Sequence, residues 1–157
     1  RFWGTTHWNA GAGTFLAKEL DSIRFIEHRF FRGSDQLLLS NPTTSLQALD
    51  STYHTARPWV EAYFIHHFDR SLLDRVPLVR TLHLVPAVGG GMLYVAEANV
   101  FHAEVYGGLE LPLRLWDQRV RVGAYRVWTD QGNPQIPGFR LKFGMDFYDS
   151  YRGRWNY

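Results

Sequence analysis

The sequence predicts an all-β fold of about eight antiparallel strands, and three observations support this prediction. Segments of about ten residues alternate between apolar and polar side chains, which is the two-residue period of a β-strand. Segments rich in Gly, Pro, Asn and Asp separate these stretches, as turns between strands require. Helical periodicity is almost absent, and only DRSLLDRVPL at 69–78 fits a short helical turn.

The clearest strand is the stretch HAEVYGGLEL at 102–111. Val105 and Leu109 share one of its faces with small or apolar residues, whereas Glu104 and Glu110 lie on the other. The other stretches follow the same rule. The third, at 45–55, becomes polar towards its end and is the weakest, and it could instead belong to one long loop from Phe31 to Pro58. In chain order the strands are expected at 6–16, 21–31, 45–55, 59–68, 79–94, 101–111, 119–129 and 139–148.

Composition excludes several classes of protein. The 157 residues suit one domain, and we expect a single β-barrel segment over residues 1–157. A formal net charge of +2 without a basic run excludes a nucleic-acid binder, and the absence of Cys excludes disulfides and thiolate metal sites. No apolar run approaches the ~18 residues of a membrane-spanning helix.

Three features favour a transmembrane β-barrel. The strands have the ~9–11 residues that a tilted strand needs to cross a bilayer. The polar faces carry Gly beside charged residues, with only two Lys in the chain, which suits a barrel interior better than a solvated surface. Aromatic residues lie near the strand ends, as in interfacial girdles. A soluble β-barrel that binds a small ligand within its apolar faces gives the same alternation and is the alternative.

The barrel interpretation assigns the two faces of each strand. The polar side chains of Glu61, Glu104, Glu110 and Arg121 should face the interior. The outward, lipid-facing set should include Val105, Leu109, Val122, Phe143 and Phe147.

No site of chemistry is predicted, whether catalytic, cofactor-binding or metal-binding. Adjacent His66 and His67 point to opposite faces of a strand, so they cannot join Asp69 around one ion. An acid–base pair drawn from His83 and the interior glutamates has no supporting motif, and charges inside barrels more often line water or hold loops. We therefore expect a non-enzymatic protein without a cofactor.

Two stretches resemble a known family. They are HHFDRSLLDRVPLVRTLHLVPAVGGGMLY, from His66 to Tyr94, and the ending GFRLKFGMDFYDSYRGRWNY. The order of their elements resembles that in large Bacteroidota outer-membrane proteins. Those proteins have an N-terminal carboxypeptidase-regulatory-like domain and a C-terminal barrel similar to the BamA-type surface-antigen superfamily. The resemblance covers about residues 28–148 by the order of its elements. It implies that this chain is the C-terminal part of a longer barrel in a bacterial outer membrane. A complete small barrel of eight strands also fits the length and is the alternative.

The resemblance also implies roles for particular residues. FRG at 31–33 is similar to an Arg-Gly motif on an inward loop of BamA-type barrels, so Arg32 would pair with Glu61, Glu104 or Glu110, although Ser34 replaces the family's aromatic residue and a plain Arg-Gly turn is the alternative. A C-terminal strand read by the barrel-assembly machinery would comprise Gly144, Phe147, Trp155 and Tyr157. The implied partners are outer-membrane lipid, that machinery, and the remaining strands from the same protein or a partner chain.

Overall fold

The structure is a computed structural model that describes residues 4–16, 27–49, 53–68, 73, 82–96, 100–130, 139–152 and 154–156. These residues contain β-strands and no α-helix, which confirms the prediction of an all-β antiparallel fold. The strands are β1 Thr5–Gly13, β2 Arg29–Phe31, β3 Tyr53–Thr55, β4 Trp59–His67, β5 Val85–Val95, β6 Val100–Leu115, β7 Gln118–Thr129, β8 Phe139–Asp149 and β9 Arg154–Asn156.

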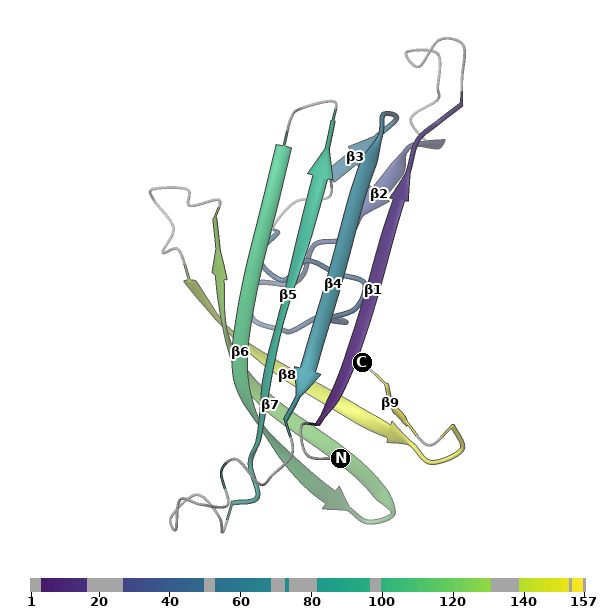
Figure 1. Cartoon of the computed structure of the whole chain (residues 1–157). Coiled ribbons are helices and arrows are strands. Elements are labelled where there is room, and N and C mark those ends of the chain that lie inside the picture. Colours follow the sequence, from purple (N-terminus) through teal and green to yellow (C-terminus); the bar gives the residue numbers. More distant parts are fainter. Residues whose placement is uncertain are drawn as a thin grey trace.

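Seven strands form one antiparallel sheet in the order β1-β4-β5-β6-β7-β8-β9 (Figure 1). From β4 onwards each strand pairs with the next one along the chain, as in a series of hairpins. β1 pairs with β4 instead, because the chain between them leaves the sheet to form the small β2–β3 sheet. In the described part of the chain, no pairing joins β1 to β8 or β9, so the sheet is open and a closed barrel stays a prediction.

Six of the eight expected strands correspond to long strands of the main sheet. The strand expected at 45–55 is wrong: residues 45–49 form a buried irregular segment, and among the described residues of this stretch only Tyr53–Thr55 is a strand. The segment departs from a strand because the backbone N–H groups of Gln47 and Ala48 bind the Glu104 carboxylate instead of a neighbouring strand.

The remaining differences lie at the ends of elements. Of the strand expected at 21–31, residues 21–26 lie outside the described part, and within the described residues 27–31 only Arg29–Phe31 is a strand. The strand expected at 79–94 begins at Val85, after a turn in which His83 has a φ of 52°. The short β9 was not predicted, and the helical turn considered at 69–78 falls almost wholly outside the described residues.

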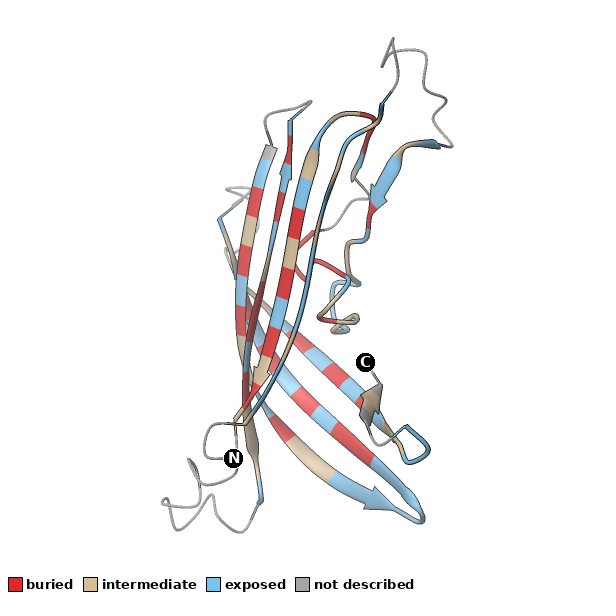
Figure 2. Ribbon diagram, turned by 45° about the vertical axis from the view of Figure 1, so that its right-hand side comes forward, coloured by how far each residue is buried: buried red, intermediate tan, exposed pale blue. Residues whose placement is uncertain are grey.

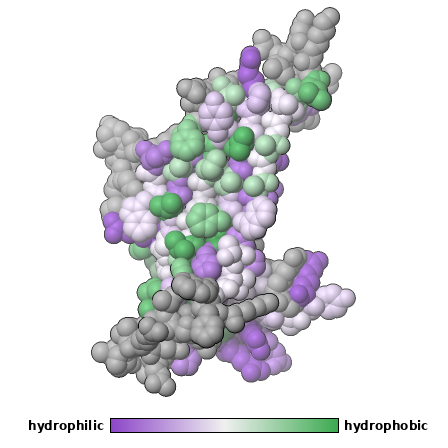
Figure 3. All heavy atoms as spheres, in the orientation of Figure 1, coloured by the Kyte–Doolittle hydropathy of each residue, from purple (hydrophilic) through white to green (hydrophobic). Residues whose placement is uncertain are grey.

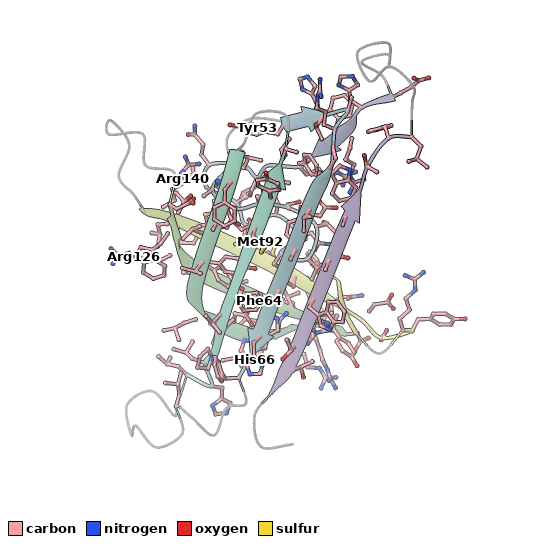
Figure 4. The ribbon with its side chains drawn as sticks, turned by 45° about the horizontal axis from the view of Figure 1, so that its top comes forward. Tyr53, Phe64, His66, Met92, Arg126 and Arg140 are labelled. Carbon is pink, nitrogen blue, oxygen red and sulfur yellow. The ribbon has the colours of Figure 1, made fainter. Side chains whose placement is uncertain are left out.

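The main sheet is strongly curved, and its two faces differ in burial (Figure 2). We call the face that carries Glu104 and Glu110 the inner face, and the opposite face the outer face. Residues 32–49, the inner segment, lie against the inner face and contact it on β6 and on β8. On the outer face, large apolar side chains such as Phe64 and Met92 are exposed (Figure 4).

Apolar contacts between the inner segment and the sheet form the core in two clusters. In one, Leu46 and Leu49 pack with Phe31, Tyr63, Leu93 and Val95. In the other, Ala48 packs with Ile65, Ala87, Tyr106, Tyr125 and Val127. The inner segment therefore supplies the apolar cover that the inner face of a single-layer sheet lacks.

Glycines let two tyrosine rings lie flat against the inner face. The Tyr106 ring covers Gly89, and the Tyr125 ring covers Gly108 and Gly123. A Cβ atom at Gly108 would collide with the Ala124 carbonyl oxygen and the Tyr125 ring. A Cβ atom at the adjacent Gly107, on the outer face, would lie 3.9 Å from its nearest neighbour, the Ala87 carbonyl oxygen.

This contrast predicts different effects of two matched substitutions. Gly108→Ala should lower the free energy of unfolding by about 1–3 kcal/mol, because the backbone or the Tyr125 ring must move. Gly107→Ala should change it by less than about 0.5 kcal/mol. Denaturant unfolding followed by tryptophan fluorescence measures both variants, and equal losses would contradict the packing of Tyr125 described above.

Candidate functional site in the interior of the sheet

The inner face buries six charged residues, each less than a tenth exposed as a whole residue. They come from β4, β6, β7 and β8, and only β5 intervenes between β4 and β6 in the sheet. The alternation of side chains along each strand places all six on the same face. They are Glu61, Glu104, Glu110, Arg121, Lys142 and Asp146. Because a buried charge without a partner is strongly unfavourable, their partners define what the interior does.

Glu104 binds the inner segment through the segment's backbone. Its Oε1 accepts a hydrogen bond from the Gln47 amide, and its Oε2 accepts one of 2.7 Å from the Ala48 amide. His102 Nε2 lies 3.2 Å from the same Oε2. Two backbone amides at one carboxylate form charge-assisted hydrogen bonds, which are stronger than neutral ones.

Lys142 holds the other end of the inner segment with the opposite charge. Its Nζ donates to the backbone carbonyl of Asp35, to that of Leu38 at 3.4 Å, and to Ser34 Oγ at 3.0 Å. Backbone hydrogen bonds from Leu37 and Leu38 lower the pKa of the Asp35 carboxyl below its usual value, so Asp35 stays charged and fixes this turn.

The inner segment also pairs with the edge of β8 that faces away from β7. Leu38 forms a parallel bridge with Phe143, in which the Leu39 amide donates to the Phe143 carbonyl and the Phe143 amide donates to the Leu37 carbonyl, both at 2.8 Å. The segment thus covers part of the β8 edge, and β9 covers another part at Phe147–Asp149.

Glu110, Arg121 and Asp146 form a second network nearer the β6–β7 turn. Glu110 Oε2 lies 3.1 Å from Arg121 Nε and 3.0 Å from His67 Nδ1, and Glu110 Oε1 accepts a hydrogen bond from the Tyr125 hydroxyl. Arg121 Nη2 lies 3.1 Å from Asp146 Oδ2. One guanidinium group therefore joins two buried carboxylates on neighbouring strands.

Glu61 makes the third set of contacts, with an arginine of β2. Arg29 Nη2 lies 2.7 Å from Glu61 Oε1, and the Tyr63 hydroxyl donates to Glu61 Oε2 at 2.9 Å. Arg32 was expected to pair with an interior carboxylate, but its side chain is exposed. Glu61 pairs instead with Arg29, which precedes Arg32 by three residues. Glu104 and Glu110 are likewise engaged by other groups.

The described residues of the expected C-terminal assembly signal lie on the paired strands β8 and β9, in different surroundings. Gly144 lies on the inner face beneath the Tyr125 ring, and Phe147 is exposed on the outer face. The Trp155 ring lies 5.3 Å from the Tyr148 ring and 4.5 Å from the Arg121 guanidinium carbon, between ring centre and carbon. Tyr157 lies outside the described residues.

Several interior residues were not among those predicted, chiefly Lys142, Asp146, His67 and Tyr125. Strand parity carried a signal for Lys142 and Asp146, since both alternate with exposed apolar residues of β8 and share a face with Gly144. The role of Arg29 had no such signal, because β2 belongs to a separate two-stranded sheet.

The histidines weighed as metal ligands are separated by the sheet. His66 Nδ1 lies 2.7 Å from Thr6 Oγ1, whereas His67 lies on the inner face with Glu110, and Asp69 is outside the described residues. Among the described residues, no group of three or more His, Cys, Asp or Glu is arranged to hold a metal ion. No helix within these residues has the length and apolarity to cross a membrane.

The sequence of the chain matches the model of a known family. Residues 1–109 of the 157 match the model described as "Family of unknown function (DUF5686) C-terminal domain". The chain belongs to this family. No curated protein and no solved structure matches the chain.

The two anchors predict separate responses in the inner segment. Glu104→Leu removes the acceptor for Gln47 and Ala48, and leaving those amides unsatisfied costs about 1–3 kcal/mol. Hydrogen exchange in peptides covering 45–49 should therefore accelerate by about tenfold or more. Lys142→Met should accelerate exchange at 35–39 instead, so each variant serves as the control for the other. An equal acceleration of hydrogen exchange at 35–39 and at 45–49 in either variant would contradict the two-anchor description.

Proposed function

We propose that this member of the DUF5686 C-terminal-domain family is part of an integral β-barrel protein of a bacterial outer membrane, with a structural, transport or envelope-assembly role and no catalytic activity. The main sheet supplies a portion of the barrel wall. The inner segment lies on the side that becomes the barrel interior. The resemblance to surface-antigen-type barrels with a carboxypeptidase-regulatory-like domain is part of the same proposal.

The observation that carries the proposal is the reversed polarity of the sheet. The inner face buries six charged side chains, whereas the outer face exposes large apolar ones. Fully burying one such side chain is worth about 1.5–3 kcal/mol, so a face that leaves many of them exposed to water is unfavourable. They include Trp8, Val60, Phe64, Val88, Met92, Val105, Leu109, Val122, Leu141, Phe143, Met145 and Phe147.

The arrangement of this surface suits a bilayer. Apolar side chains gather across the middle of the outer face over β1, β4, β5 and β6 (Figure 3). β4 and β5 have 9 and 11 residues, the length of a tilted membrane-spanning strand. Arg126, a charged residue of this face near the end of β7, lies with its guanidinium carbon 5.1 Å from the centre of the Trp128 ring. An arginine beside an aromatic ring at a strand end is typical of a membrane interface.

The open edges support the view that further strands complete the barrel. An edge strand that faces hydrocarbon leaves backbone groups unpaired, at several kcal/mol for each group. β1 offers such an edge, and β8 is covered only in part by Leu37–Leu39 and β9 within the described residues. The missing strands come from the rest of the same protein or from a partner chain.

The contacts of the inner face favour a structural or transport role over catalysis. Glu104 and Lys142 are occupied in binding the backbone of the inner segment, and Glu110 and Asp146 share Arg121. These contacts fix a segment inside the curved wall, where it narrows any passage. The expected partners are outer-membrane lipid and, during biogenesis, the barrel-assembly machinery, which would read the end of the chain.

The alternative of a soluble β-barrel that binds a small ligand fits the burial less well. A soluble barrel of that kind turns its apolar faces inward around the ligand. Here the inward-facing side chains include Glu104, Glu110, Arg121 and Lys142 beside the apolar clusters, and the large exposed apolar side chains face outward.

Fractionation of cells that contain the full-length protein tests the proposal. Membranes washed with sodium carbonate and then with urea should retain the protein, and detergent should release it, because the outer face needs an apolar surrounding. A periplasmic protein and a known integral membrane protein serve as the two controls. Release into the carbonate wash, with a monodisperse protein in the absence of detergent, would overturn the proposal and favour the soluble alternative.

A further inference from the structure

A hollow of about 300 Å³ lies beside the β2–β3 sheet, lined by Arg29, Phe30, Arg32, Thr44 and Glu61. It is at the end of the main sheet where β4 begins, the end that Tyr53 marks in Figure 4. Its volume is at the lower end of the range for small-ligand sites, which is roughly 300–1,000 Å³. None of the contacts described above for the inner segment uses this hollow.

Arg29 is held in place with part of its guanidinium group turned to the hollow. Nη2 is bound to Glu61 at 2.7 Å, and the guanidinium carbon lies 5.0 Å from the centre of the Trp59 ring. The side chain nevertheless keeps 47% of its surface exposed. A guanidinium group has five N–H donors, so the pair with Glu61 leaves donors for a second acceptor.

Arg32 brings a second guanidinium group to the same hollow. The Arg32 backbone is fixed, since its carbonyl accepts a hydrogen bond of 3.0 Å from the Leu46 amide, while its side chain is exposed. Among the lining residues, two arginines and one glutamate leave a net charge of +1. The surrounding stretches 28–32 and 53–57 contain no Asp or Glu, so no acidic residue of β2 or β3 offsets this charge.

We propose that this hollow is a binding site for a phosphate group carried by a small molecule or a lipid headgroup. A planar guanidinium group binds two oxygens of one oxyanion at once, and two such groups need more acceptors than a single carboxylate offers. The three terminal oxygens of a phosphomonoester provide them, and the Thr44 hydroxyl can donate to the same group. The inference depends on the hollow itself and not on the placement of the sheet in a membrane.

The test is a titration with inorganic phosphate, monitored by calorimetry, of the purified full-length protein in micelles of an uncharged detergent. Wild-type protein should bind phosphate saturably, and Arg32→Gln should raise the Kd at least tenfold. Arg152→Gln is the matched control, because Arg152 is an exposed arginine of the β8–β9 turn, far along the sheet from the hollow, and it should bind as the wild type does. The absence of saturable binding by the wild type, or an equal Kd for wild type and Arg32→Gln, would overturn the proposal.

A second measurement identifies the source of the phosphate and guards against a misfolded variant. In nanodiscs that contain phosphatidate, a lipid with a phosphomonoester headgroup, a headgroup site should lose its affinity for inorganic phosphate, whereas phosphatidylcholine nanodiscs should leave it intact. Retained affinity in both nanodiscs assigns the site to a soluble phosphate compound. The milder Arg32→Lys, which keeps the charge but loses the planar fork, should give a Kd between those of wild type and Arg32→Gln. A Kd for Arg32→Lys no better than that of Arg32→Gln would contradict a role for the charge.

Discussion

The rest of the interior depends on the hydrogen bonds that the Glu104 carboxylate and the Lys142 ammonium group form with the backbone of the inner segment. Both are buried on the inner face, and both find their partners in the backbone of the inner segment and not in each other. A buried charge must be satisfied, so the segment cannot leave the inner face without exposing these groups to an unfavourable environment. The same placement puts Leu46 and Ala48 of the segment against the sheet, where they complete the two apolar clusters. Charge satisfaction and apolar burial therefore fix the same segment in the same place.

The same strands present the opposite character on their other side. Because alternation in a β-strand has a period of two, a sequence that places charges on one face and apolar residues on the next fixes both surfaces together. The segment covers the charged face, while the described part of the chain leaves the apolar face exposed. Hydrocarbon is the surrounding that we propose for such a face. The buried charged residues are tolerated because each has a partner within the chain.

The long strands and their two faces could be predicted from the sequence, because each is written locally in the alternation of neighbours. Val105 against Glu104 and Phe143 against Lys142 are readable without any tertiary information. Residues 45–49 of the inner segment were predicted as part of a strand because their decisive bonds, from Gln47 and Ala48 to Glu104, join residues 57 and 56 positions apart. Glu61 pairs with Arg29 and not with Arg32 because of how β2 packs beside β4, and a single sequence carries no signal for that packing. Lys142 and Asp146 could have been added to the interior set by parity alone.

Site-directed spin labelling in lipid bilayers tests the reversed polarity of the sheet most directly. The chain contains no cysteine, so single cysteines at Val105, Leu109, Val122 and Phe143 on the outer face give unique labels. We predict that each collides frequently with dissolved oxygen, which concentrates in lipid, and rarely with a water-soluble nickel complex. A label at Trp116, in the β6–β7 turn and 93% exposed, should show the reverse. Frequent collisions with the nickel complex at the outer-face positions would place that face in water and contradict the account.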